Sequence, residues 1–154
     1  MTTTHTIREA VAADRDWLAE CAIAMALETE HRHLDADTVR AGVAAGIADS
    51  AKARYFVAVD GNGAPVGTLM LTREWSDWRN GDWWWIQSVY VVPAQRRRGV
   101  FAALYRHAET LARATTGVVG LRLYVERGND AARRTYAALG MVDAGYDILE
   151  AEMP

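Results

Sequence analysis

The stretch SVYVVPAQRRRGVFAALYRHAE, residues 88–109, joins a β-strand to a helix through an arginine-rich turn. The strand ends at a proline, and the helix begins at about Gly99. The free N–H groups and the dipole of a helix start attract anions, and a pyrophosphate fits such a site well. Arg96, Arg97 and Arg98 would add charge-assisted hydrogen bonds to phosphate oxygens. The alternative is a solvated basic loop, because runs of arginine are common on protein surfaces.

A second informative segment, NDAARRTYAALGM, spans residues 129–141 and follows a predicted strand. Its spacing predicts a helix that stops at Gly140. Asn129 and Tyr136 are seven residues apart, about two helical turns, so their side chains share one face. Tyr136 is then either a core tyrosine with a satisfied hydroxyl or a phenol that meets a bound molecule.

The remaining elements follow from hydrophobic periodicity and turn residues. Asp37 is predicted as the N-cap of its helix, and Asn80-Gly81 favours positive backbone angles in a tight hairpin turn. In chain order we expect a strand at 6–9, helices opening near 14 and 37, strands at 54–59, 66–72 and 83–92, a helix at 99–115, a strand at 121–126, a helix at 129–139, and one or two strands within 141–152. This order predicts an α/β (mixed α+β) fold and a single domain over residues 1–154.

Together, VYVVPAQRRRGVF and NDAARRTYAALGM resemble the GCN5-related N-acetyltransferase (GNAT) superfamily, and the order of elements is similar to that family's fold. The resemblance implies a central, mostly antiparallel twisted sheet with a splayed pair of strands and helices on both faces. It also implies acetyl-coenzyme A as co-substrate, with its pyrophosphate held by the family signature R-x-x-G-x-G/A. Arg96, Gly99 and Phe101 occupy the three fixed positions of that signature. Phe101 departs from the family pattern and fits only if its side chain points into the core.

The resemblance also implies roles for individual residues. Backbone groups of Val89 and Val91 would line the pantetheine arm, Asn129 would contact it, and Tyr136 would lie near the sulfur. A phenol near its ordinary pKa is protonated at pH 7, so Tyr136 can give a proton to the departing thiolate. The implied coenzyme-binding set is Val89, Val91, Arg96, Arg97, Arg98, Gly99, Val100, Phe101, Asn129 and Tyr136.

The general base is open. Many family members carry a glutamate where this chain has Gln87, and an amide cannot accept the proton. Glu28, Glu30 and Glu74 are candidate replacements of similar rank, and a chain of waters is a further alternative. Each of the three acids can equally be a surface charge.

The stretch EWSDWRNGDWWWIQSVY, residues 74–90, holds five of the six tryptophans. Strand alternation predicts that one face carries Trp83, Trp85, Gln87 and Val89, and the other Trp84, Ile86 and Ser88. Core packing accounts for about half of this cluster. The remainder, with Glu74, Asp77 and Asp82, forms an aromatic and acidic rim that suits a cationic amine. We therefore expect residues 74–85 to form one wall of the acceptor site.

Composition argues against several other classes. A net charge of −3 disfavours a nucleic-acid binder, and no apolar run reaches the roughly twenty residues of a membrane span. The start MTTTHTIREA lacks the pattern of a signal peptide, which favours a cytoplasmic location. The single cysteine, Cys21, lies in an alanine-rich helical stretch and is expected to pack. His31 and His33 face different ways on a helix without a third ligand nearby, so no metal is expected.

The sequence favours an acetyl-coenzyme A-dependent N-acetyltransferase that acts by direct attack on a primary amine of a small, cationic acceptor. A protein or peptide amine is an alternative acceptor. A non-catalytic acyl-coenzyme A sensor is an alternative from another class. Gln87 and Phe101 favour the sensor, whereas Asn129 and Tyr136 count against it. The expected assembly is a monomer or a homodimer.

Overall fold

The computed structural model describes residues 4–154. The chain divides into two compact units, Met1–Leu123 and Tyr124–Pro154. The first unit contains the sheet and most of the helices, and the second contains the helix α4 (Asp130–Ala138). The sequence-based expectation of one domain over residues 1–154 stays a prediction.

A five-stranded sheet forms the centre of the first unit. Its strands, in spatial and chain order, are β1 (Thr6–Glu9), β2 (Arg54–Val59), β3 (Pro65–Ser76), β4 (Gly81–Val91) and β5 (Val118–Leu123). Neighbouring strands are antiparallel except for the last pair, β4 and β5, which are parallel. The predicted mixed α/β class and the mostly antiparallel sheet are confirmed.

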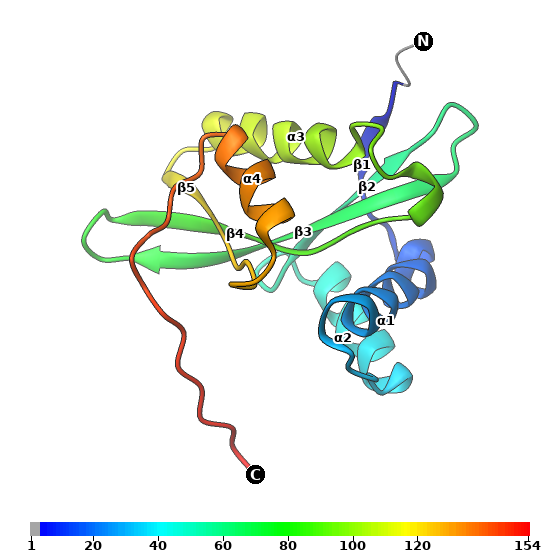
Figure 1. The fold of residues 1–154 in the computed structure, drawn as a ribbon, viewed down its shortest axis with the longest axis horizontal. Coiled ribbons are helices and arrows are strands. Elements are labelled where there is room, and N and C mark those ends of the chain that lie inside the picture. The colour runs from blue at the N-terminus through cyan, green and yellow to red at the C-terminus, as the bar shows by residue number, and fades with distance from the viewer. Residues whose placement is uncertain (1–3) are drawn as a thin grey trace. The chain divides into compact units, whose positions relative to one another are not determined.

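Helices cover both faces of this sheet (Figure 1). They are α1 (Arg15–Glu30), α2 (Ala36–Ala48) and α3 (Val100–Ala114). On β2, Val57 packs against Leu18 of α1 and Val43 of α2, whereas the next side chain, Phe56, lies 4.9 Å from the His107 ring of α3. Because successive strand residues point to opposite faces, α1 and α2 cover one face and α3 covers the other.

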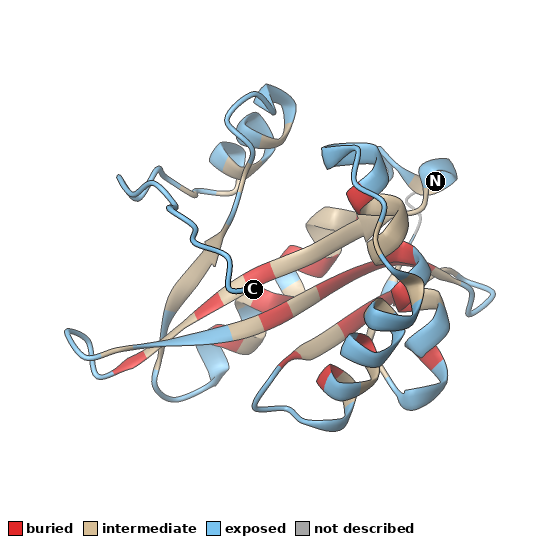
Figure 2. Cartoon of the chain, turned by 90° about the horizontal axis from the view of Figure 1, so that it is seen from below, coloured by how far each residue is buried: buried red, intermediate tan, exposed pale blue. Residues whose placement is uncertain are grey.

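The core places the start of α3 against the middle of β3. Val100, Leu104 and Leu69 are fully buried, and Figure 2 shows buried positions concentrated on the central strands. A Cβ at Gly67 of β3 would lie 2.6 Å from Cγ1 of Val100. The absence of a side chain at Gly67 therefore lets the first turn of α3 lie close to β3.

The β3–β4 hairpin turns through residues 77–80, between the paired residues Ser76 and Gly81. Asn80 has a φ of 46°, which confirms the positive backbone angle that the sequence predicted there. Gly81 is the first residue of β4, where a Cβ would lie 2.6 Å from the carbonyl oxygen of Gly117. Glycine is therefore needed at Gly81 for close approach.

Two sequence-based boundaries were wrong. The N-cap of α2 is Asp35 and not Asp37, because the helix begins at Ala36 and Asp35 Oδ2 accepts from Thr38 N at 2.9 Å. The fifth strand spans Val118–Leu123 and not 121–126, because its parallel pairing with β4 begins where Val118 faces Asp82.

The predicted C-terminal strands are absent from the described residues, where α4 ends and an irregular segment follows. Gly140, with a φ of 92°, ends the helix region as expected. Residues 141–152 pair with no strand, and their larger apolar side chains, among them Ile148 and Leu149, are exposed. An apolar pattern does not make a strand until the backbone groups find a partner strand.

Candidate functional site

The edge of β4 becomes free halfway along the strand. Its parallel pairing with β5 ends where Ile86 faces Leu123, and residues 87–91 have no partner strand on that side within residues 4–154. The two strands therefore separate, as the sequence led us to expect. Backbone N–H and C=O groups along this edge are available to a bound molecule.

A β-bulge accompanies the separation. Thr68 pairs with Tyr90 and Met70 pairs with Gln87, so three steps along β4 match two steps along β3. Ser88, between them, has a φ of 51°, which is uncommon for a residue other than glycine. The extra residue puts Tyr90 on the face of Gln87. The simple alternation that placed Val89 on that face was wrong.

The start of α3 follows a short 3₁₀ turn, η2 (Pro93–Gln95). Gly99 is the N-cap and has a φ of 80°, and no side chain caps the helix. The N–H groups of the first turn therefore lack intrahelical acceptors. A Cβ at Gly99 would meet nothing within 4 Å, so the backbone angle, and not crowding, requires glycine.

The three arginines of the turn differ in their contacts. Arg97 and Arg98 are exposed and form no ion pair with the described residues. Arg96 instead points away from the helix start: its Nε donates to the Val91 carbonyl at 2.9 Å and its Nη2 to Glu28 Oε2 at 2.7 Å. The phosphate-binding role of all three stays a prediction, and Arg97 and Arg98 are the two whose charge is not already paired.

The residue at the third signature position lies at the side of the helix. Phe101 is half-buried, and its ring centroid is 6.2 Å from that of Tyr105, one turn further along. The neighbouring Val100 is the residue that enters the core. The Phe101 side chain was expected to point into the core, but it lies between the core and the surface.

Two of the three predicted base candidates already accept hydrogen bonds from arginines. Glu28 accepts from Arg96 and, at 3.3 Å, from the Tyr90 hydroxyl. Glu74 Oε1 accepts from Trp85 Nε1 at 2.8 Å and from Arg122 at 3.3 Å.

The third candidate, Glu30, is exposed, and its carboxylate has no hydrogen bond or ion pair within the described part of the chain. Gln87, at the position where many relatives carry a glutamate, donates to Thr72 Oγ1 at 2.6 Å. Its amide therefore joins β4 to β3.

The tryptophans of the hairpin have different environments. Trp84 is buried in the core. Trp83 lies over Gly120 of β5, where a Cβ would be 2.5 Å from its ring. The guanidinium carbon of Arg122 lies 4.0 Å from the Trp83 ring centroid, and that of Arg79 lies 5.1 Å from it. Arginines of the protein therefore occupy the cation-binding faces of Trp83.

Two further tryptophans of the cluster are open to solvent. Trp75 is 64% exposed and Trp78 is 88% exposed. Sequence reasoning missed Arg122 and Tyr90, which lie 48 and 62 residues from their carboxylate partners. No local pattern signals such pairs. The order and register of β3, β4 and β5 bring Arg122 to Glu74, and the packing of α1 on β4 brings Glu28 to Tyr90.

The second unit carries the other two predicted site residues. Asn129 caps α4, because its Oδ1 accepts from Ala132 N at 3.1 Å. Tyr136 lies on the same helix and is half-buried, and burial raises the pKa of its phenol. Tyr136 is therefore protonated at neutral pH, as a proton donor must be.

Several further predictions concern residues outside this region. Cys21 is buried, and burial raises the pKa of its thiol to about 12, so a reactive thiolate is not expected there. His31 ends α1 in a left-handed conformation, and residues 4–154 contain no cluster of three or more potential metal ligands. None of the helices in that range is long and apolar enough to cross a membrane.

A cavity of about 430 Å³ lies on the α3 side of the sheet, lined in part by Lys52, Arg54 and Trp84. None of the residues predicted to bind coenzyme A or to act in catalysis lines it. The candidate site is therefore the open surface at the end of β4 and not this cavity.

The chain was compared with models of known protein families. A family model described as "Acetyltransferase (GNAT) family" matches residues 15–141. The chain belongs to the GNAT family. The match includes the whole of both the 88–109 stretch and the 129–141 segment, so the resemblance seen in the sequence is confirmed.

Solved structures agree with this assignment. A possible acetyltransferase from Clostridium difficile 630 is 40% identical, with a TM-score of 0.91 over 97% of this chain and 98% of that chain. A probable acetyltransferase is 20% identical, with a TM-score of 0.83 and coverage of 97% and 98%. A putative acetyltransferase from Agrobacterium tumefaciens str. C58 is 26% identical, with a TM-score of 0.75 and coverage of 94% and 99%. A search of curated protein sequences finds no significant match.

GNAT enzymes use acetyl-coenzyme A as co-substrate, and the local geometry fits that molecule. A pyrophosphate needs N–H donors and cationic side chains, and the residues suited to provide them are Gly99 and Val100 at the start of α3, with the exposed Arg97 and Arg98. An extended amide chain such as pantetheine needs an open strand edge, which residues 87–91 of β4 supply.

Proposed function

We propose that this GNAT protein transfers an acetyl group from acetyl-coenzyme A to a primary amine by direct attack. The observation that carries the proposal is the bulged, unpaired end of β4 leading through a turn into the uncapped start of α3. These segments belong to one compact unit and are contiguous in the chain. Along the chain the free strand edge is followed by the proposed anion site, just as the pantetheine arm of the coenzyme is joined to its pyrophosphate.

The coenzyme is held mainly by backbone groups in this proposal. N–H groups of Gly99, Val100 and Phe101 bind the pyrophosphate, and Arg97 and Arg98 add charge. Backbone groups near Val89 and Val91 contact the pantetheine arm, although the Val91 carbonyl already accepts from Arg96. What supports these roles is that Gly99 gives α3 no side-chain cap, and that residues 87–91 have no partner strand on the β5 side within residues 4–154.

The coenzyme supplies an acetyl group activated as a thioester, and the protein supplies orientation and proton transfer. N–H groups on the free edge of β4 stabilise the oxyanion that forms when the amine adds. The Tyr136 phenol gives its proton to the thiolate, and its raised pKa keeps that proton in place at neutral pH. Asn129 uses its oxygen to cap α4, which leaves its NH₂ group for the coenzyme.

Removal of the amine proton is assigned to Glu30 or to water. Glu28 and Glu74 already accept hydrogen bonds from arginines, whereas Glu30 has no protein partner within residues 4–154. The Glu30 carboxylate is therefore the one of the three that can approach the amine without giving up an ion pair.

The acceptor is a small, cationic amine in this proposal, with residues 74–85 as one wall. Trp75 and Trp78 are exposed and have no arginine stacked on them in the described structure, so their rings can take a cation. Glu74 contributes less than its sequence position indicated, because Arg122 shares its charge.

Release of free thiol from acetyl-coenzyme A in the presence of a panel of amines tests the proposal. We expect thiol release that depends on the acceptor and saturates with both substrates. If calorimetry detects coenzyme binding but no amine supports release, the protein is an acyl-coenzyme A sensor. If the coenzyme does not bind, the proposed site is wrong.

A further inference from the structure

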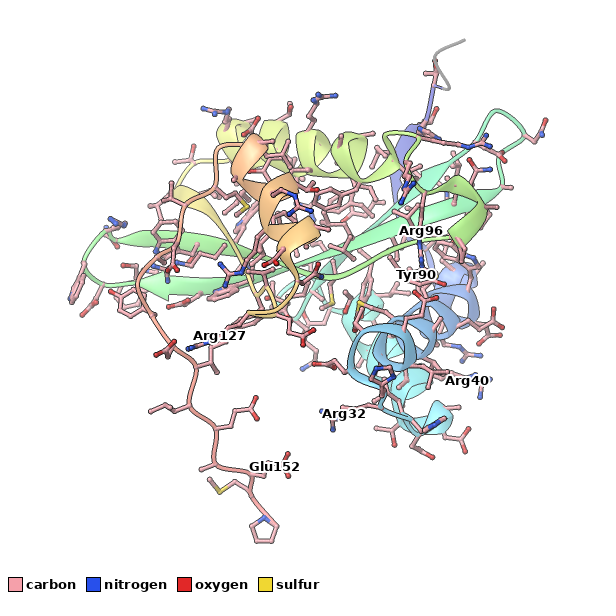
Figure 3. The ribbon with its side chains drawn as sticks, in the orientation of Figure 1. Arg32, Arg40, Tyr90, Arg96, Arg127 and Glu152 are labelled. Atoms are coloured by element: carbon pink, nitrogen blue, oxygen red, sulfur yellow. The ribbon has the colours of Figure 1, made fainter. Side chains whose placement is uncertain are left out.

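A polar cluster joins the end of α1 to the end of β4, and it consists of Glu28, Tyr90, Val91 and Arg96. Glu28 accepts from Arg96 Nη2 at 2.7 Å with one oxygen and from the Tyr90 hydroxyl at 3.3 Å with the other. Arg96 Nε donates to the Val91 carbonyl at 2.9 Å. Figure 3 shows the Arg96 and Tyr90 side chains next to each other, and the guanidinium carbon lies 5.4 Å from the tyrosine ring centroid.

Arg96 is the first residue of the turn that leads into α3, so its contacts bear on the shape of that turn. Arg97 has a φ of 63° and Gly99 a φ of 80°. Arg97 and Arg98 make no hydrogen bond with the described residues. The turn is therefore held at its two ends, by Arg96 on one side and by the first turn of α3 on the other.

We propose that Glu28 is a positioning residue, which holds Arg96 against β4 and thereby keeps the turn 96–99 in the conformation that binds coenzyme A. This inference rests on the proposed function. Glu28 acts here through Arg96 and touches neither the acceptor nor the thioester. Arg96 holds the turn against β4, and Arg97 and Arg98 supply the positive charge that binds the phosphates.

Three features favour this role over that of a general base. Both carboxylate oxygens of Glu28 already accept hydrogen bonds, one of them from a cation. Arg96 donates to a backbone carbonyl in the same direction, so its guanidinium is fixed at two points. The Tyr90 ring packs beside it, because the bulge at Ser88 puts Tyr90 on the face that α1 covers.

The pair is about half exposed, with 41% of the Glu28 side chain and 43% of the Arg96 side chain accessible. Exposed ion pairs contribute little, so the effect on coenzyme affinity should be moderate, a factor of about five or less. A base, in contrast, contributes about 10² to 10⁴ to turnover. The size of the effect and the kinetic constant that changes therefore separate the two roles.

The test is Glu28→Gln, with Glu20→Gln, an exposed glutamate of the same helix, as the matched control. We expect Glu28→Gln to weaken coenzyme A binding in calorimetry and to raise the KM for acetyl-coenzyme A by about fivefold. Its kcat should stay within about twofold of wild type, and the pH profile of kcat should not change. Glu20→Gln should match wild type in all four readouts.

A double-mutant cycle makes the test specific. Arg96→Gln should weaken binding to a similar extent, and the double variant should be no worse than either single variant, because both act through one contact. Additive losses would overturn the proposal. Tighter coenzyme binding by Glu28→Gln would also overturn it, because a freed Arg96 would then be a phosphate ligand.

The remaining outcomes separate this inference from the proposed function. A wild-type protein that binds no coenzyme A overturns both. A wild-type protein that binds coenzyme A, together with a Glu28→Gln variant that binds it equally well, overturns the positioning role alone. A fall in kcat of a hundredfold or more, with loss of the acidic limb of the pH profile, makes Glu28 the base and contradicts the proposal.

Discussion

Replacing Gly99 by alanine tests the proposed anion site without removing any side chain. Gly99 is the N-cap of α3 and has a φ of 80°, where a Cβ would meet nothing within 4 Å. The substitution therefore causes no clash, and its only direct cost is the left-handed backbone conformation. That cost is about 1–2 kcal/mol for an L-residue with a side chain.

The same free energy acts on coenzyme binding if the bound turn requires this backbone angle. An alanine relaxes the free protein toward negative φ, and the coenzyme must then restore the left-handed conformation. A cost of about 1–2 kcal/mol weakens the affinity by about five- to thirtyfold. The β2–β3 turn offers a matched control, because Gly63 also has a φ of 80° and open space around its would-be Cβ.

Calorimetric titration with coenzyme A and thermal denaturation are run on both variants. Gly63→Ala should lower the melting temperature by about 2–4 °C for each kcal/mol of strain, whereas Gly99→Ala should lower it less, because its turn relaxes in the free protein. Only Gly99→Ala should lose coenzyme affinity. If Gly99→Ala binds coenzyme A as wild type does and its melting temperature is also unchanged, the relaxed turn still binds and the left-handed angle before α3 is not needed for the pyrophosphate.

Three further substitutions test other parts of the structure. Tyr136→Phe should lower kcat by roughly 10² to 10⁴ with near-normal coenzyme binding. Because burial raises the pKa of Tyr136, the alkaline limb of the wild-type pH profile should lie above about pH 10. A limb well below that pH would count against Tyr136 as the proton donor. Trp75→Ala should raise the KM for the acceptor more than the KM for acetyl-coenzyme A. Because the Trp75 side chain is exposed, the melting temperature should stay nearly unchanged. An unchanged acceptor KM would show that Trp75 is not part of the acceptor wall. Asp14→Asn should lower stability at pH 7 by about 2 kcal/mol, because hydrogen bonds from Arg8 lower the pKa of this carboxyl. That contribution is present above the ordinary carboxyl pKa and is lost as pH falls through the lower folded value, so the melting curves of the two proteins should converge only in acid, below the ordinary carboxyl pKa.

Short-range signals were sufficient for the elements that frame the site. Gly99 after an arginine run, followed by an apolar helical pattern, predicted the start of α3 to within a residue. Asn129 was predicted to open α4 and does cap it, and Asn80 was predicted to turn the hairpin and does so. Each of these features depends on backbone preferences within a few residues, which the sequence carries directly.

The prediction failed where a partner far along the chain was needed. Residues 141–152 have an apolar pattern that suggested strands, yet they pair with no strand in the described structure. Alternation along β4 put Val89 on the face of Gln87, but the bulge at Ser88 put Tyr90 there. Strand pairing and register depend on the neighbouring strand, so the sequence of one strand cannot determine them.

The sequence by itself determined the family, the order of the elements up to the last helix and the position of the helix start at Gly99, because local patterns and a signature encode them. The tertiary structure decided what the charged residues do. It paired Glu28 with Arg96 across 68 residues and Glu74 with Arg122 across 48 residues. It also stacked Arg122 on Trp83, one of the rings in the stretch 74–85 that was expected to line the acceptor site. A charge binds a substrate only if no nearer partner neutralises it, and that partner is set by how helices and strands pack, not by spacing along the chain.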